Sequence, residues 1–195
     1  MVEDKIKEII AKHKSGEKKL YSLIKIKELQ ENERIYFFGL GFIQIKLSDK
    51  YRIHFYNKKL PSITDSIHNH RYDFNSYILK GEFTNQVFKE DKGGELFTLN
   101  NESCNPEIEA PELSKKIYLT EDSKKVYKEG ESYFMDYTWL HKVESDYAIT
   151  LLERSNYKQE FAQIALKENE ENICAFSKKI DEKLLWSIIG EMLND

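Results

Sequence analysis

Apolar residues change their spacing twice along this chain, from a helical period to a strand period and back. In residues 3–32 the apolar positions recur at intervals of three and four, which is the pattern of an amphipathic helix. The segment predicts two short helices that are separated near Ser15-Gly16. A similar apolar stripe runs from about Ser177 to Leu193 and predicts one more helix after the strands.

Between these helical segments, β-branched and aromatic residues form many short runs that turn signals separate. The runs are residues 35–38, 42–47, 51–56, 77–79, 83–88, 116–119, 125–127, 133–135 and 148–152. Turn signals between them include Ser48-Asp49-Lys50, Lys80-Gly81 and Gly93-Gly94. Many short strands without helical spacers predict an antiparallel barrel or sandwich. Residues 95–114 are predicted to be irregular.

A length of 195 residues is enough for one well-buried core and short for two. The chain shows no internal repeat and no low-complexity tract. We therefore predict a single domain over residues 1–195. It would comprise a helical N-terminal flank (1–33), a barrel (34–157) and a C-terminal extension that ends in a helix (158–195).

Charge and composition exclude several classes of protein. The 30 basic and 34 acidic residues give a net charge of −4, so a polyanion such as nucleic acid is not an expected partner. No apolar run approaches the roughly 20 residues that span a bilayer, and the charged first residues do not form a secretory leader. Cys104 and Cys174 are too few for a disulfide framework. We predict a cytoplasmic protein with free thiols, either a monomer or a homodimer.

Three of the five histidines have the spacing of a metal site. A strand points residues i and i+2 to the same face, so His68 and His70 can offer two imidazoles to one point. His141, from a later strand, would supply a third and leave coordination positions open for a substrate. The alternative is that these histidines are polar residues on the rim of the barrel. Three imidazoles suit iron, zinc, copper, nickel or cobalt, so the ligand set alone does not select the metal.

The segments around these histidines resemble the two motifs of the cupin superfamily. The first cupin motif has His-x-His, four residues, a Glu, about six residues and a Gly. Here His68 to Gly81 keep that spacing, with Asn75 at the Glu position. In the second motif Gly130 and His141 keep the spacing to about one residue, although other residues replace its Pro and second Gly. The resemblance implies an all-β cupin barrel (double-stranded β-helix or jelly-roll) with helices at both ends.

Within the superfamily the chain looks most like the thiol dioxygenases, of which cysteine dioxygenase is the best known. Those enzymes hold iron with three histidines and no carboxylate, which agrees with Asn75 at the Glu position. The resemblance therefore implies Fe(II), with zinc, nickel, manganese, cobalt or copper as alternatives. The substrate residues differ, because Gln44 stands where the family has an arginine that binds the substrate carboxylate. Leu152 and Arg154 stand where it has a catalytic His and Tyr.

Several other residues are candidates for binding or catalysis. Arg52 shares one strand face with His54 and Tyr56, and the three could line a pocket. Arg154 would offer a fixed fork to an anion if its strand face points inward, or pair with an acid if it points outward. We predict Arg52, Gln44, Arg154 and Asn75 as substrate-binding residues. We predict Tyr56, Tyr77 and Arg154 as catalytic residues, with a tyrosine as proton donor.

The sequence favours a mononuclear metal-dependent cupin oxygenase, similar to the thiol dioxygenases, acting on a small polar or anionic molecule and O2. Two alternatives remain open. One is a metal-dependent isomerase, epimerase or lyase of the sugar-type cupins, and the other is a cupin that binds a ligand without catalysis. The substrate and the oligomeric state do not follow from the sequence.

Overall fold

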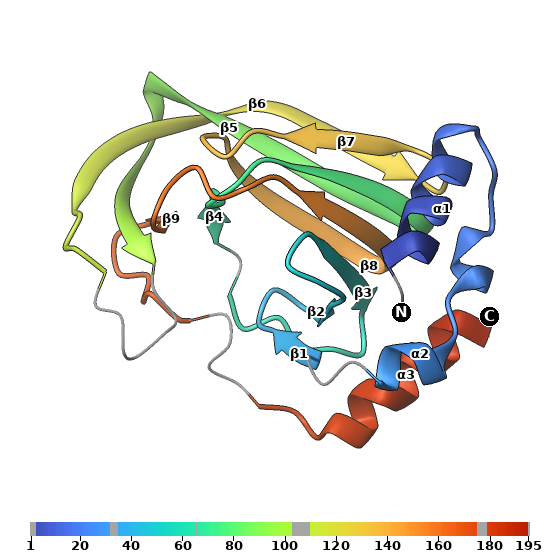
Figure 1. Cartoon of the computed structure of the whole chain (residues 1–195). Coiled ribbons are helices and arrows are strands. Elements are labelled where there is room, and N and C mark those ends of the chain that lie inside the picture. The colour runs from blue at the N-terminus through green and yellow to red at the C-terminus, as the bar shows by residue number, and fades with distance from the viewer. Residues whose placement is uncertain (1–2, 32–34, 65, 103–109, 175–178, 195) are drawn as a thin grey trace.

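The computed structural model describes residues 3–31, 35–64, 66–102, 110–174 and 179–194. Its helices lie at the two ends of the chain and its strands lie between them (Figure 1). The helices are α1 (Glu3–Lys14), the 3-10 helix η1 (Leu20–Leu23), α2 (Ile26–Gln30) and α3 (Glu182–Asn194). The strands are β1 (Ile35–Phe38), β2 (Phe42–Lys46), β3 (Tyr51–Asn57), β4 (Ile67–His68), β5 (Phe74–Glu102), β6 (Lys115–Lys128), β7 (Ser132–Met135), β8 (Leu140–Arg154) and β9 (Ala162–Leu166).

The strands form one antiparallel sheet that closes on itself. Its order is β1-β2-β3-β8-β4-β9-β5-β6, and β5 also pairs with β7 and with β8. The pairings β8–β4, β4–β9, β9–β5 and β5–β8 complete a ring. A closed ring of strands is a barrel, which leaves its inner face available for a cavity.

The two faces of this sheet have different partners. On β2 and β3, the residues Ile43, Ile45, Ile53 and Phe55 belong to a core that also holds apolar side chains of α1 and α3. The neighbouring positions of the same strands face the barrel interior and line its cavity. The apolar stripes of the terminal helices therefore pack against one outer face of the sheet, and Figure 1 shows the helices gathered on one side of the strands.

Strand β5 changes the face that its side chains present. Phe74 and Ile78 belong to the interior cluster, as does Phe83 further along the strand. The inward positions thus change from even to odd numbers. The register with β8 shifts between Ile78 and Lys80, so one residue is inserted into the alternation there. Such a β-bulge exchanges the inner and outer faces of the strand that follows it.

The prediction of an all-β chain with helices at both ends is confirmed, with differences in detail. The Lys80-Gly81 and Gly93-Gly94 signals do not end strands, because β5 continues through both with shifts of register. Residues 95–102, predicted to be irregular, belong to β5, whereas residues 103–109 lie outside the described part. The predicted second helix is η1 followed by α2, and the last helix begins at Glu182.

The C-terminal segment also departs from its prediction. Residues 158–195 were expected to lie outside the barrel, yet β9 in this segment pairs with both β4 and β5.

The expectation of free thiols is wrong for Cys174, which is disulfide-bonded. The other cysteine of the sequence, Cys104, lies outside the described residues. Structural disulfides are rare in the cytosol, so this one gives no support to the predicted cytoplasmic location. No helix among the described residues is long and apolar enough to cross a membrane.

Candidate metal centre

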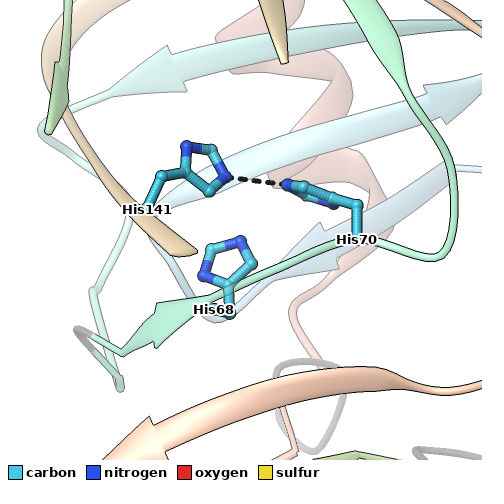
Figure 2. A group of neighbouring side chains, drawn as sticks. All are labelled: His68, His70 and His141. Carbon is cyan, nitrogen blue, oxygen red and sulfur yellow. Dashed lines mark hydrogen bonds between the residues drawn. The ribbon is translucent and has the colours of Figure 1, made fainter. Parts of the chain in front are cut away.

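Three histidines from two paired strands and the turn after one of them come together inside the barrel. His68 ends β4 and lies directly opposite His141 of β8 in the antiparallel register. His70 follows two residues after His68, and all three rings point toward one another (Figure 2). One ring nitrogen from each lies within 4.8 Å of the others. His70 Nε2 and His141 Nε2 are 2.7 Å apart.

Hydrogen bonds fix which nitrogen of two of these rings carries the proton. His68 Nδ1 lies 3.1 Å from the Ser66 carbonyl oxygen, which can only accept, so Nδ1 donates. His141 Nδ1 donates to Asn85 Oδ1 at 2.7 Å. In a neutral imidazole the other nitrogen is then an acceptor. Both rings therefore hold Nε2 as a lone-pair donor, which is the arrangement of ligating histidines whose other nitrogen is held by an outer partner.

The surroundings of the three rings keep them neutral. Burial lowers the pKa of His68, and it lowers the pKa of His70 and His141 well below the usual value. For His70 and His141 the neighbouring histidines add to this effect, because a positive charge on one ring disfavours a positive charge on the next. Only neutral imidazole binds a metal ion. The three rings are therefore in the binding form at neutral pH.

Asn69, between the two histidines of the pair, is held in place by several hydrogen bonds. Its Oδ1 accepts from the backbone N–H of Gln163 at 2.7 Å and from Gln159 Nε2 at 3.2 Å. Its Nδ2 donates to Gln163 Oε1 at 3.1 Å. Gln159 Nε2 also donates to the His70 carbonyl oxygen at 2.9 Å. The short segment that follows β4 and carries His70 is thus held mainly by side-chain hydrogen bonds, and not by a long run of strand pairing.

The histidines stand in the wall of a cavity of about 800 Å³ inside the barrel. This is within the usual range for a small-molecule site. Much of its wall is aromatic, and its polar groups come mainly from β2, β3 and the three-histidine cluster. The residues that line it include Phe38, Phe42, Gln44, Arg52, His54, Tyr56, His68, Asn69, His70, Tyr72, Phe74, Ser76, Phe83, Glu102, Tyr133, His141, Thr150, Leu152 and Glu160.

Gln44 joins two of the predicted cavity residues. Its Oε1 accepts from Arg52 Nη1 at 3.3 Å and from His54 Nε2 at 3.2 Å. Burial, with the positive charge of Arg52, lowers the pKa of His54 to about 3. His54 is therefore neutral and hydrogen-bonded, which agrees with its expected place in the wall. It does not belong to the cluster of metal-ligating groups found among the described residues.

The depressed pKa of His54 predicts an acid-sensitive contribution to stability. The unfolded chain binds a proton at His54 near pH 6.5, whereas the folded chain binds it near pH 3. Between these values the unfolded state holds the extra proton, so the free energy of unfolding falls as the pH falls. In metal-free His54→Gln protein, we expect the slope of this free energy against pH to be smaller by about 1.4 kcal/mol per pH unit. Urea denaturation between pH 4 and 6 measures it, and identical slopes would contradict the assignment.

Two tyrosines face the cavity, and one of them was not predicted as a site residue. Tyr56, a predicted proton donor, is buried, and burial raises its pKa well above the usual value. Tyr133 is likewise buried in the wall with a raised pKa, and it hydrogen-bonds to Ser76. Both hydroxyls therefore keep their protons at neutral pH. Buried and exposed side chains alternate along β7, and Tyr133 is on the buried face. The sequence does not show which face of this short strand is turned inward, so it did not identify Tyr133 as a cavity residue.

Three predicted site residues lie elsewhere. Asn75 is exposed on the outer face of β5, and Tyr77 is buried on that outer side, where its hydroxyl donates to Glu153 at 3.1 Å. Inward positions in this part of β5 are even-numbered, so neither side chain lines the cavity. Arg154 is buried, but it packs behind the wall against Tyr72 and Tyr157, with its guanidinium carbon 5.1 Å and 4.4 Å from the two ring centres. None of the three side chains lines the cavity. The structure therefore does not support the predicted catalytic roles of Tyr77 and Arg154 or the predicted substrate contact of Asn75.

The residues present fit a metal ion. Two imidazoles have their Nδ1 protons held by oxygen acceptors, and the three rings meet at one point without a carboxylate. Such a set matches the three-imidazole sites of transition metals, and it leaves open coordination positions. His68, His70 and His141 would hold the ion. Asn85, which sequence analysis did not identify, would orient His141.

Comparison with known proteins gives only distant likenesses. No family model and no curated protein matches the chain. Among solved structures, E. coli ycfD is 10% identical with a TM-score of 0.34, over 77% of this chain and 31% of that one. The chain thus spans about a third of the length of that protein. An RmlC-like cupin from Shewanella frigidimarina NCIMB 400 is 14% identical with a TM-score of 0.34, over 71% and 88% of the two chains.

A third solved structure is hydroquinone 1,2-dioxygenase from Sphingomonas sp. TTNP3 with 4-hydroxybenzoate bound. It is 10% identical with a TM-score of 0.34, over 69% of this chain and 74% of that one. Likenesses this distant carry no argument about activity. The fold class is an all-β antiparallel barrel with helices at both ends, which follows from the closed ring of strands. The two histidine segments meet across the β4–β8 pair, as the resemblance to the cupin motifs predicts.

Proposed function

We propose that this protein is a mononuclear metal-dependent cupin oxygenase, with iron as its metal, that acts on a small anionic molecule. The observation that carries the proposal is the convergence of three neutral imidazoles on one point in the wall of a cavity inside the barrel. A metal held by three imidazoles supplies open coordination positions and, when it is redox-active, the means to activate O2. The iron and the reaction type are supported by the resemblance to the thiol dioxygenases.

The chain's own residues would bind and orient the substrate. Arg52 lies in the cavity wall with a positive charge, and Gln44 fixes its direction through a hydrogen bond. Tyr56 and Tyr133 offer protonated hydroxyls for transfer to a developing anion. Leu152 lines the wall where the thiol dioxygenases have a catalytic histidine. That difference gives no support to cysteine as the substrate.

Oxygen consumption distinguishes this function from its alternatives. Protein reconstituted with Fe(II) is expected to take up O2 in the presence of a substrate drawn from a panel of small carboxylates. Protein reconstituted with Zn(II) is expected to consume none. Equal turnover with Zn(II), or turnover without O2, would instead identify an isomerase, epimerase or lyase.

The hydrogen bond from Asn85 to His141 gives a second test, which does not need a substrate. Because Asn85 Oδ1 holds the proton on His141 Nδ1, its loss frees the ring to rotate and to change tautomer. We expect Asn85→Ala to lower the affinity for Zn(II) by roughly 10- to 100-fold, as for other partners that orient a metal ligand. Competition with a fluorescent zinc chelator measures it. Asn101→Ala, on the same strand but hydrogen-bonded to Pro111, should keep the wild-type affinity.

A further inference from the structure

One arginine of the cavity wall has few hydrogen-bond partners for its guanidinium group. Arg52 extends from β3 on the cavity side, and its Nη1 donates to Gln44. Its guanidinium carbon lies 5.1 Å from the ring centre of Tyr72. Its Nε is buried, and in the described structure it has no hydrogen-bond partner. A guanidinium carries five N–H donors in a fixed fork, so this one has donors left for a ligand.

The positive charge of Arg52 also lacks a counterion. Within the described ranges, no carboxylate lies within ion-pair distance of its side chain. Two acids line the same cavity, and they are Glu102, whose pKa burial raises toward the neutral form, and the exposed Glu160. A partly buried cation without an acid is destabilising until an anion binds it. The position therefore suits an anionic group of a ligand.

This charge lies close to the histidine cluster. Arg52 and His70 both lie against Tyr72, with the guanidinium carbon 5.1 Å and the His70 ring centre 6.0 Å from the centre of the Tyr72 ring. Arg52 and the three histidines line the same cavity. An anion on Arg52 would thus have the rest of its molecule directed into the interior, beside the three imidazoles.

The wall around that interior is built of flat rings. Phe42 stacks on Phe38 at 4.7 Å between ring centres and contacts Tyr56 at 4.8 Å. Phe83 stacks on Tyr133 at 5.7 Å. Aromatic walls favour flat apolar groups, because these bury area and pack in offset or edge contacts with the rings.

We propose that the cavity binds a carboxylate that carries a flat apolar body, with Arg52 holding the carboxylate through the Nη end of its guanidinium group. The aromatic wall formed by Phe38, Phe42, Tyr56 and Phe83 holds the body. The inference names the substrate class of the proposed oxygenase and rests on it only for the position beside the metal. Recognition by Arg52 does not require the ion.

The test compares three probes on metal-free protein by isothermal titration calorimetry. Benzoate has both the charge and the ring, benzamide keeps the ring without the charge, and acetate keeps the charge without the ring. We expect benzoate to bind at least about tenfold more tightly than either of the other two. Equal affinity for benzoate and benzamide would overturn the proposal, and this comparison needs no variant.

Variants then assign the effect to Arg52. We expect Arg52→Gln to weaken benzoate at least about tenfold and to leave benzamide unchanged. Arg71→Gln removes an exposed arginine of the same cavity rim and should change neither. Unchanged benzoate affinity in Arg52→Gln would refute the assignment.

Metal content separates this inference from the proposed function. If the protein binds no metal but benzoate still depends on Arg52, the carboxylate site stands and the oxygenase fails. If the protein binds metal but shows no preference for benzoate, the carboxylate site fails alone.

Discussion

Protein that carries both His68→Ala and His70→Ala is expected to bind no metal, whereas the wild type binds about one equivalent. The double substitution removes two of the three imidazoles that meet at one point, and the remaining His141 cannot hold an ion alone. Elemental analysis of protein purified without a metal-chelating tag measures the difference. The expected loss is the whole bound equivalent, since a single imidazole is a weak ligand in water.

A matched control keeps this result specific. His54→Gln changes another buried histidine of the same cavity that lies outside the three-histidine cluster, and it should keep the full equivalent. The folded state of each variant is checked by circular dichroism. Equal metal content in the wild type and in the double variant would remove the metal site, and with it the proposed oxygenase.

Gly81→Ala is expected to destabilise the fold more than Gly16→Ala or Gly93→Ala. Gly81 has φ +74°, where an L side chain is strained, and a Cβ there would overlap the backbone carbonyl of Tyr147 on β8. Neither strand can move away, because they are hydrogen-bonded on both sides of this point. We expect a loss of at least about 3 kcal/mol in the free energy of unfolding, in the range of the most damaging substitutions.

Substitutions at two other glycines separate the cost of the backbone conformation from the cost of the Cβ overlap. Gly16 has φ +86° with open space around it, so Gly16→Ala shows the cost of the backbone conformation alone, about 1–2 kcal/mol. At Gly93 the nearest atom is an Asp91 side-chain oxygen at 3.6 Å and φ is not positive. Gly93→Ala should change stability by less than about 0.5 kcal/mol. Urea denaturation of the three variants measures the order, and a loss for Gly81→Ala no larger than for Gly16→Ala would contradict the overlap.

The meeting of the three histidines could be predicted from the sequence, because it depends on local alternation and on motif spacing. His68 and His70 are two residues apart in an extended segment, and His141 is fixed by its spacing from Gly130. No knowledge of the sheet is needed for such a pair. The order of terminal helices and central strands was predictable for the same reason, since the period of the apolar residues is a local property.

The rest of the site could not be predicted, because it depends on where alternation is interrupted. The inserted residue after Ile78 exchanges the two faces of β5. Asn75, before it, consequently faces outward, whereas Asn85, after it, faces the cluster and holds His141. Nothing in the sequence distinguishes these two asparagines. The glycine at position 81 indicates a special backbone conformation near the bulge, but the Lys80-Gly81 pair equally predicts a turn.

Strand β9 was missed for a different reason. It has five residues and is paired with β4, which has two, and with the far end of β5. Such pairings join segments that are far apart in sequence, and their stability comes from partners rather than from local propensity. The same explanation applies to residues 95–102, whose strand conformation depends on β6 and β9.

Asn69 has a consequence for recognising related chains. In a His-x-His pair the middle residue usually points away from the metal and is free to vary. Here its side chain hydrogen-bonds to Gln159 and to Gln163, and the bonds to Gln163 hold the histidine segment to β9. A substitution at Asn69 would therefore break three hydrogen bonds at once. An asparagine between the two histidines, with glutamines at the positions of Gln159 and Gln163, would distinguish relatives of this barrel from chains that share only the histidine pair.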